Sequence, residues 1–298
     1  MNHVVTARRH APIGHGGLVP PAFWAAAVAL VIAVSLHLPL DGPFSTLAAV
    51  LILLGGGLPH GAFDIALLRR AIVLDRRAMA LVVGGYIAVA LLMAVIWLSL
   101  PLLGLILFLL IAAAHFGEDW LMLEEPLLRA GAGGAVIAAP TIWHQDAVAT
   151  LFVAIGGPDA RTVAQLVTAA APVALLITMV GVVIAWRRGK RDWAAAITAC
   201  LALLLVLPPV VGFALFFVFL HSPLHLGRTR AALRDLTTRH WLATGALLSA
   251  AAVAGWCVVQ RIAGQALGGD LTAQAFRLLA CVAVPHLLLS RWTERRLG

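Results

Sequence analysis

Long apolar runs separated by short polar clusters dominate the chain from residue 22 onward. Because a transmembrane helix needs about 20 mostly apolar residues, this pattern predicts an all-α, polytopic membrane protein with about ten transmembrane helices. The expected spans are residues 22–40, 44–68, 78–98, 101–121, 131–155, 163–186, 193–207, 209–227, 241–262 and 272–290. We expect residues 1–21 to form a polar cytoplasmic tail and residues 22–298 to form a single transmembrane helical domain.

Two of these spans rest on weaker patterns. Residues 131–155 contain the polar stretch "TIWHQD", and residues 193–207 are short. The pair Pro208-Pro209 predicts a turn after residue 207, because proline does not easily continue a helix. Treating residues 193–227 as one span would place the basic segment 228–239 outside the cell, so we expect two spans there.

Arginine and lysine cluster at one set of span ends. The clusters are Arg69, Arg70, Arg76 and Arg77; Arg187, Arg188, Lys190 and Arg191; Arg228, Arg230, Arg234 and Arg239; and Arg291, Arg295 and Arg296. Loops on the cytoplasmic side of a membrane are enriched in these residues. The pattern therefore predicts a multi-pass protein of the inner (plasma) membrane with both termini in the cytoplasm.

Composition agrees with a lipid-embedded chain. Hydrophobic residues make up 62% of the 298 residues and charged residues only 11%, whereas soluble domains carry about 25% charged residues. The net charge of +8 is spread over the span ends and forms no single patch, so it does not indicate nucleic-acid binding. The three cysteines lie in apolar stretches without metal-binding spacing.

Histidines occur at a similar depth in four of the expected spans. His60 lies in "GLPHGAFD", His115 in "AAAHFGEDW", His221 and His225 in "HSPLH", and His286 in "VPHLLL". The four spans all run from outside to inside, and each histidine lies in the inner half of its span. Since ionisable residues within a membrane are costly, this shared depth predicts a buried functional site.

A metal centre is the chemistry that this pattern favours. Residues four apart on a helix differ by about 40° in direction and roughly 6 Å in height, so His221 and His225 can bind one ion. His60 and His115 would complete a set of four nitrogen ligands, a set that suits zinc, copper, iron or nickel.

Other polar and aromatic residues are candidates for supporting roles. Asp64 and Asp119 each follow a histidine by four residues, so Asp64 could orient His60 and Asp119 could orient His115. The alternative is that both carboxylates only mark the membrane boundary. His144, Trp143 and His286 are candidates for lining a substrate cavity. The alternative for His144 is a role in helix packing, and the alternative for Trp143 is contact with lipid or a neighbouring helix. His286 is either a supporting residue or part of the cavity wall.

The motifs "GLPHGAFD", "AAAHFGEDW" and "HSPLH", in this order, resemble those of the Brp/Blh family of membrane β-carotene 15,15′-dioxygenases. The resemblance extends over essentially the whole chain. It departs from the family's first motif at Ile65, where a polar residue often follows the aspartate.

The resemblance implies an iron(II) centre held by four histidines, which match His60, His115, His221 and His225. It also implies central cleavage of β-carotene by O₂ to give two molecules of all-trans-retinal. The expected partners are therefore β-carotene and O₂ as substrates and the lipid bilayer, with a retinal-binding rhodopsin as a candidate acceptor of the product. No nucleic-acid partner is expected.

Other functions remain open from the residues alone. A di-iron hydroxylase or desaturase needs about eight histidines, some of them directly adjacent to one another. No two histidines of this chain are adjacent. A b-type cytochrome needs paired histidines farther apart than four residues. Another metal-dependent membrane enzyme on an apolar substrate, and a transporter that uses buried histidines as proton relays, are the alternatives that we retain.

Overall fold

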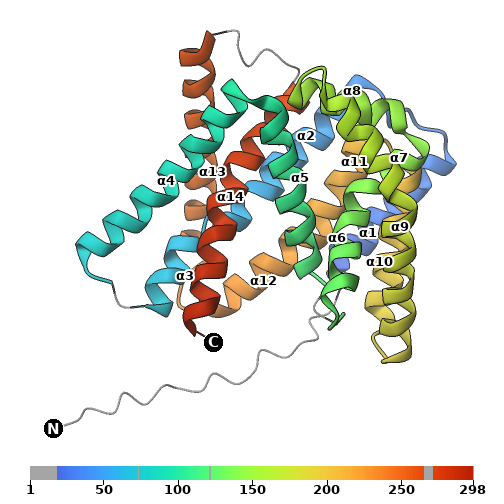
Figure 1. The fold of residues 1–298 in the computed structure, drawn as a ribbon. Coiled ribbons are helices and arrows are strands. Elements are labelled where there is room, and N and C mark those ends of the chain that lie inside the picture. Colours follow the sequence, from blue (N-terminus) through green and yellow to red (C-terminus); the bar gives the residue numbers. More distant parts are fainter. Residues whose placement is uncertain (1–18, 73, 121, 265–270, 298) are drawn as a thin grey trace.

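The computed structural model describes residues 19–72, 74–120, 122–264 and 271–297, and in this part of the chain it contains helices and no strands (Figure 1). The expected tail, residues 1–21, lies almost entirely outside the described residues. The helices are α1 (Pro21–Ser35), α2 (Pro43–Gly57), η1 (Leu58–Gly61), α3 (Asp64–Ala71), α4 (Arg76–Ser99), α5 (Pro101–Glu118), α6 (Pro126–Ala138), α7 (Pro140–Trp143), α8 (Gln145–Gly156), α9 (Ala160–Arg187), α10 (Arg191–Val206), α11 (Pro209–Ala214), η2 (Leu215–His221), α12 (Ser222–Ala232), α13 (Thr238–Ala263) and α14 (Leu271–Leu297).

Among the residues that the structure describes, seven helical segments are long and apolar enough to cross a membrane. They are Pro43–Arg70, Arg76–Ser99, Pro101–Glu118, Ala160–Arg187, Pro209–Ala232, Thr238–Ala263 and Leu271–Trp292. Each coincides with an expected span, which confirms the all-α class and the membrane character of the chain. The count of ten is not confirmed.

The other three expected spans differ from continuous membrane-length helices. The segment 22–40 forms the 15-residue helix α1, and 193–207 forms the 16-residue helix α10. Our prediction of one helix over 131–155 is wrong, because α6, α7 and α8 divide this segment. Pro140 begins α7, and His144 leaves the helical region with φ −125° and ψ 39°.

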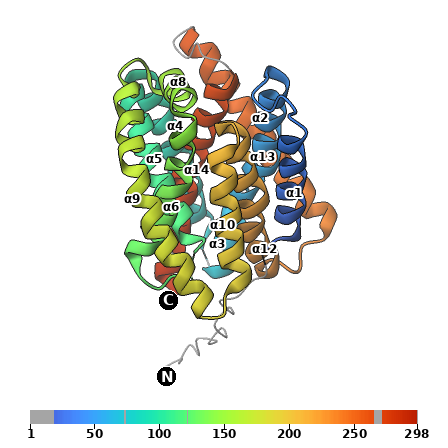
Figure 2. The ribbon, with the colours of Figure 1, turned by 90° about the vertical axis from the view of Figure 1, so that its right-hand side faces the viewer.

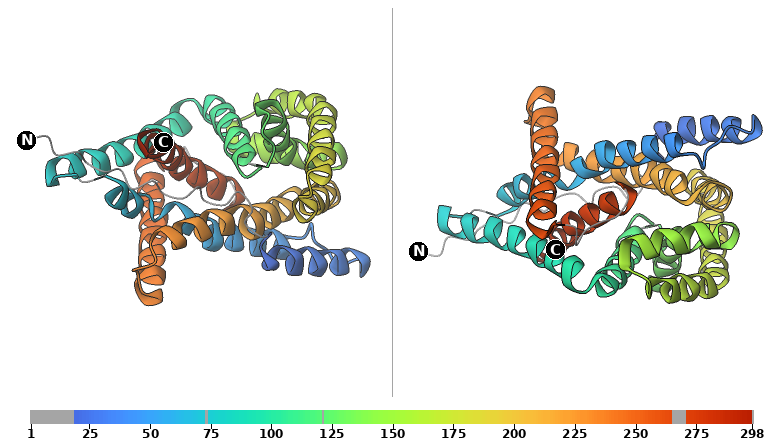
Figure 3. Two further views of the ribbon diagram at one scale, coloured as in Figure 1. Left: turned by 90° about the horizontal axis from the view of Figure 1, so that it is seen from below. Right: turned by 90° about the horizontal axis from the view of Figure 1, so that it is seen from above.

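Helix α14 is the central element of the bundle. Within its most apolar window 78% of the residues are buried, compared with 11% in α13 and 17% in both α4 and α9. Seen along the bundle, α14 lies between α4 and α5 on one side and α2, α12 and α13 on the other, whereas α1 and α13 project outward (Figure 3). The outward faces of the peripheral helices carry large apolar residues, as expected for contact with lipid.

The basic segments of the chain lie at one end of the bundle. The α3–α4, α9–α10 and α12–α13 connections and the C-terminal end of α14 all lie at the bottom of Figure 1. This arrangement agrees with the grouping of Lys and Arg that the sequence predicts for one face of the membrane. Figure 2 shows α6, α9 and α10 standing side by side between the two ends.

Glycines allow α5, α6 and α9 to pack closely. A Cβ atom on Gly133 would overlap the backbone of α5 at Ala113, and a Cβ atom on Gly117 would meet the backbone of α6 at Arg129. Small residues let membrane helices approach in this way. The close packing fixes the position of α5, the helix that carries His115.

Two expected spans are interrupted where their histidines occur. Helix α2 ends at Gly57, the 3₁₀ turn η1 carries His60, and a new helix starts at Asp64. In the second span, α11 passes into the π-helical segment η2, which ends at His221. Local π-helix is rare and occurs often at functional sites, so both interruptions point to the same region of the bundle.

Candidate metal centre and apolar pocket

Histidines from three separate parts of the chain meet beside α14. His60, His115 and His221 each offer a ring nitrogen within 4.8 Å of the other two, and all three are buried. The ring centroids of His115 and His221 are 4.7 Å apart, and those of His60 and His221 are 5.4 Å apart. His225 follows one turn later, with its centroid 4.6 Å from that of His221. The convergence expected from a shared membrane depth is thus present in the fold.

Hydrogen bonds fix the ring orientation of these histidines. The Nδ1–H of His60 donates to the carbonyl oxygen of Gly57. The Nδ1–H of His115 donates to the carboxylate of Glu118 at 3.1 Å. The Nδ1–H of His221 donates to the carboxylate of Asp119 at 2.6 Å. Carbonyl and carboxylate oxygens can only accept, so each neutral ring carries its proton on Nδ1. The lone pair of each ring is therefore on Nε2.

Two of these Nε2 atoms have no hydrogen-bond partner. Nε2 of His115 and Nε2 of His221 are buried, and neither contacts a donor or an acceptor among the described residues. A buried polar atom of this kind is costly unless something binds it. Neutral imidazoles with Nδ1 held by an acceptor and Nε2 left available are the usual form of histidine metal ligands, so the donor set fits a metal ion.

Both expected aspartates contact histidines, but not those that we predicted. Asp64 accepts a hydrogen bond from His286 at 2.8 Å, where we expected His60. Asp119 accepts a hydrogen bond from His221, where we expected His115. The prediction considered only residues four apart on one helix. In the fold each carboxylate meets a histidine from a distant segment, Asp64 with α14 and Asp119 with η2, although Asp119 keeps helical backbone angles at the end of α5. Local spacing does not contain such contacts.

Asp119 belongs to a second group of candidate ligands with His221 and His225. Its carboxylate is buried and also accepts from Nε2 of His225 at 3.2 Å. His225 therefore differs from the other histidines, since its Nε2 contacts a carboxylate and its ring is partly exposed.

Three contact residues were missing from our sequence prediction. Glu118 accepts from His115. It also accepts two hydrogen bonds from the guanidinium group of Arg291 on α14, at 2.8 Å and 3.1 Å. Tyr86 of α4 donates to Asp64 at 3.2 Å. A signal existed for two of them: Glu118 lies within the second histidine motif, and Tyr86 is the only tyrosine of the chain.

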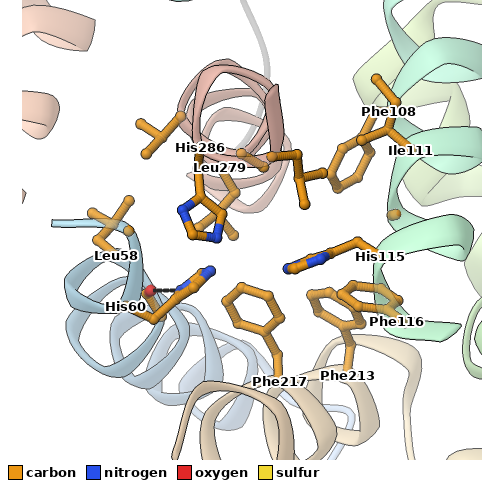
Figure 4. Close-up of a pocket in the computed structure, with 16 residues that line it drawn as sticks. Leu58, His60, Phe108, Ile111, His115, Phe116, Phe213, Phe217, Leu279 and His286 are labelled. Atoms are coloured by element: carbon orange, nitrogen blue, oxygen red, sulfur yellow. Dashed lines mark hydrogen bonds between the residues drawn. The ribbon is translucent and has the colours of Figure 1, made fainter. Parts of the chain in front are cut away.

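An apolar pocket opens directly onto the histidines. His60, His115 and His286 all point into it (Figure 4). The remaining walls are apolar and include Phe213 and Phe217 of the α11–η2 segment. A second apolar pocket lies toward α6 and α8. Four residues line both pockets, so the two lie next to each other: Phe108, Ala112, Phe116 and Phe213.

Two expected cavity residues lie elsewhere. His144 bonds through Nε2 to the carbonyl oxygen of Val206 at 3.1 Å, and Trp143 is 64% exposed. Neither lines the two pockets described above. His286, by contrast, lies in the pocket wall, as expected.

Comparison with known proteins decides the family. The model of the beta-carotene 15,15′-dioxygenase family matches residues 48–294. The chain belongs to this family. The residues matched by the beta-carotene 15,15′-dioxygenase model include all five clustered histidines of this chain, together with Asp64 and Asp119.

A curated member of the beta-carotene 15,15′-dioxygenase family shows the same relationship. The protein named beta-carotene 15,15′-dioxygenase from uncultured marine bacterium 66A03 is 26% identical over 249 residues, which cover 78% of this chain and 88% of the relative. No solved structure matches the chain.

Proposed function

We propose that this protein cleaves β-carotene at its central 15,15′ double bond with one molecule of O₂, giving two molecules of all-trans-retinal. Membership in the family over residues 48–294 carries this proposal. One oxygen atom is transferred to each carbon of the broken double bond, so the reaction needs no other reductant or oxidant.

We assign the metal to His60, His115, His221 and His225 and its identity to iron(II). Iron bound by these neutral imidazoles would supply the activation of O₂, with open positions left by the absence of a carboxylate ligand. Glu118 and Asp119 hold His115 and His221 through Nδ1. Their role is to keep Nε2 directed at one point.

The apolar pockets suit a long polyene. Pocket residues such as Phe116 and Phe213 can contact a hydrocarbon chain and exclude water, but offer no hydrogen bond that would favour a polar substrate. Since β-carotene dissolves in the bilayer, a site between membrane helices can take it up without exposing it to water. The polyene would lie with its middle against the histidines and one half in the second pocket.

The surrounding assignments belong to the same proposal. The protein resides in the inner membrane with the basic end of the bundle in the cytoplasm, following the distribution of Lys and Arg. Retinal released into the bilayer would be available to a retinal-binding rhodopsin.

Expression in carotene-producing cells tests the activity. Cells that contain the wild-type chain should lose their orange colour and form two retinals for each β-carotene consumed, as measured by chromatography of the pigment extract. Cells with the His60→Ala variant should keep their colour.

Other products would change the assignment. Apocarotenals of unequal length would show that the pocket places another double bond at the histidines. Unchanged carotene beside folded, iron-loaded protein would favour a different apolar substrate. Activity in transport without bound metal would favour the transporter.

A further inference from the structure

His286 on α14 has the same environment as His115 and His221, two of the histidines that we assign to the metal. Its Nδ1–H donates to both carboxylate oxygens of Asp64, at 2.8 Å each. Its Nε2 is buried and has no hydrogen-bond partner among the described residues, as is true for His115 and His221. The ring points into the pocket from the side opposite Phe217, toward His60 and His115 (Figure 4).

The ring of His286 lies next to this cluster. Its ring centroid is 5.1 Å from that of His60 and 5.8 Å from that of His115. The centroids of His60 and His221 are 5.4 Å apart, so His286 is as near to His60 as His221 is. His286 is not part of the group whose ring nitrogens all lie within 4.8 Å of one another, which contains His60, His115 and His221, but it faces this group across the pocket (Figure 4).

A hydrogen-bonded chain holds His286 in this orientation. Tyr86 of α4 donates to Asp64 at 3.2 Å, and Asp64 accepts from His286, so three helices contribute to one polar network. Asp64 is buried, and its second contact therefore compensates a costly charge. A carboxylate on Nδ1 raises the basicity of an imidazole and fixes its direction, which favours metal binding at Nε2.

We propose that His286 is a further metal ligand through Nε2, positioned by Asp64 and Tyr86. This inference depends on the proposed metal centre but adds a residue that the sequence motifs do not assign. It also distinguishes His286 from His225, whose Nε2 faces Asp119 and not the shared centre. One ligand of the metal would then come from α14, which has the largest buried share of the seven membrane-length segments found in the described residues.

Iron binding and spectroscopy test this assignment without an activity assay. Purified protein in detergent is titrated with ferrous iron against a chelator, and the electron paramagnetic resonance spectrum of its nitric oxide adduct is recorded. The His286→Ala variant should bind iron about 100-fold more weakly and give an altered spectrum, and Asp64→Asn should lower the affinity about 10-fold. The control is His37→Asn, because His37 is exposed with φ 53°, a conformation that asparagine tolerates.

A His286→Gly variant separates ligation from a structural role. Added imidazole should enter the space left by the side chain and restore iron affinity to within about 10-fold of wild type. Wild-type affinity and spectrum in His286→Ala would overturn the assignment. Iron loss that imidazole fails to restore in His286→Gly would overturn it as well, since the residue would then act through the fold.

The His60→Ala variant shows which proposal has failed. If wild-type protein binds iron, His60→Ala loses it and His286→Ala keeps it, then the metal centre stands and only the role of His286 is wrong. If the wild-type protein binds no iron, both proposals are wrong.

Discussion

Asp119 connects two histidines of the site through one buried carboxylate. It accepts from Nδ1 of His221 at 2.6 Å and from Nε2 of His225 at 3.2 Å, and its side chain is completely enclosed. Few other buried groups can balance its charge, so the carboxylate and the two imidazoles form one electrostatic unit. Removal of the charge should therefore disturb both rings together.

The Asp119→Asn variant should bind iron about 10- to 100-fold more weakly than wild type, because an amide is a poorer acceptor for the Nδ1–H of His221. Iron per chain after gel filtration measures this loss. Asp235→Asn is the matched control, since Asp235 is exposed and pairs only with Arg70 on the surface. Equal iron content in both variants would contradict the role of Asp119.

At the residue scale the sequence identified most of the cluster but not its pairing. His60, His115, His221 and His286 could be found because histidine is rare inside apolar spans, and the two aspartates because they adjoin the motifs. The partners of the aspartates could not be found, because Asp64 and His286 are 222 residues apart in sequence. Their contact depends on how α14 packs against α3. The role of the histidines as metal ligands stays a prediction.

The junction of the two apolar pockets lies on one face of α5. Ala112 is buried and lines both pockets, whereas Ala114 lies on the exposed face of the same helix. A large side chain at this position would fill space in both pockets, where we propose that the polyene lies. The two alanines therefore provide a matched pair of positions.

The Ala112→Phe variant should lower kcat/KM for β-carotene about 100-fold while iron content stays at the wild-type level, since misplacing a substrate by about 1 Å can cost this much. Retinal formation by purified protein measures the effect. Ala114→Phe should retain activity. A fully active Ala112→Phe variant would show that the polyene does not extend into the second pocket.

A second matched pair tests the packing of α6 on α5. Gly133 faces the backbone of α5, where a Cβ atom would overlap the carbonyl of Ala113, whereas the nearest atom to a Cβ on Gly134 is 4.0 Å away. Gly133→Ala should destabilise the protein by about 1–3 kcal/mol, and Gly134→Ala should have little effect. Thermal unfolding in detergent measures the difference, and equal melting temperatures would contradict the close approach.

At the element scale the apolar pattern located most helices but not their interruptions. Hydropathy averages over a window, so the segment 131–155 resembled a single span although Pro140 and His144 break it. The same averaging concealed η1 and η2, where the site residues lie. Such breaks are stabilised by neighbouring helices, which a local pattern does not contain.

The whole molecule has its basic connections at one end, which leads to a test of orientation. A reporter fused after Arg239, and another fused to the C-terminus, should both report the cytoplasm because Lys and Arg favour that side. Alkaline phosphatase and a fluorescent protein, each active on only one side of the membrane, measure this location. A reporter after Arg239 that acts outside the cell would disprove the division of residues 193–227 at Pro208-Pro209.

The family and the membrane class could be predicted for the whole molecule, because both depend on features spread along the chain. The central position of α14 could not, since its mean hydropathy of 1.5 is the lowest of the seven membrane-length segments found in the described residues and only tertiary packing buries it. For the same reason His286 could be placed at the right depth but given no definite role.

The position of α14 also bears on the order of assembly during synthesis. Helices α2, α4 and α5 all contact α14 and all precede it in the chain. Because a chain grows from its N-terminus, these helices are made before α14, and the side of the pocket that α14 covers lies open to lipid until α14 packs against them. Cofactor loading should therefore depend on this late packing step. A chain in which α14 fails to insert would keep an unfilled centre, which cellular proteases that recognise incompletely packed membrane helices could remove.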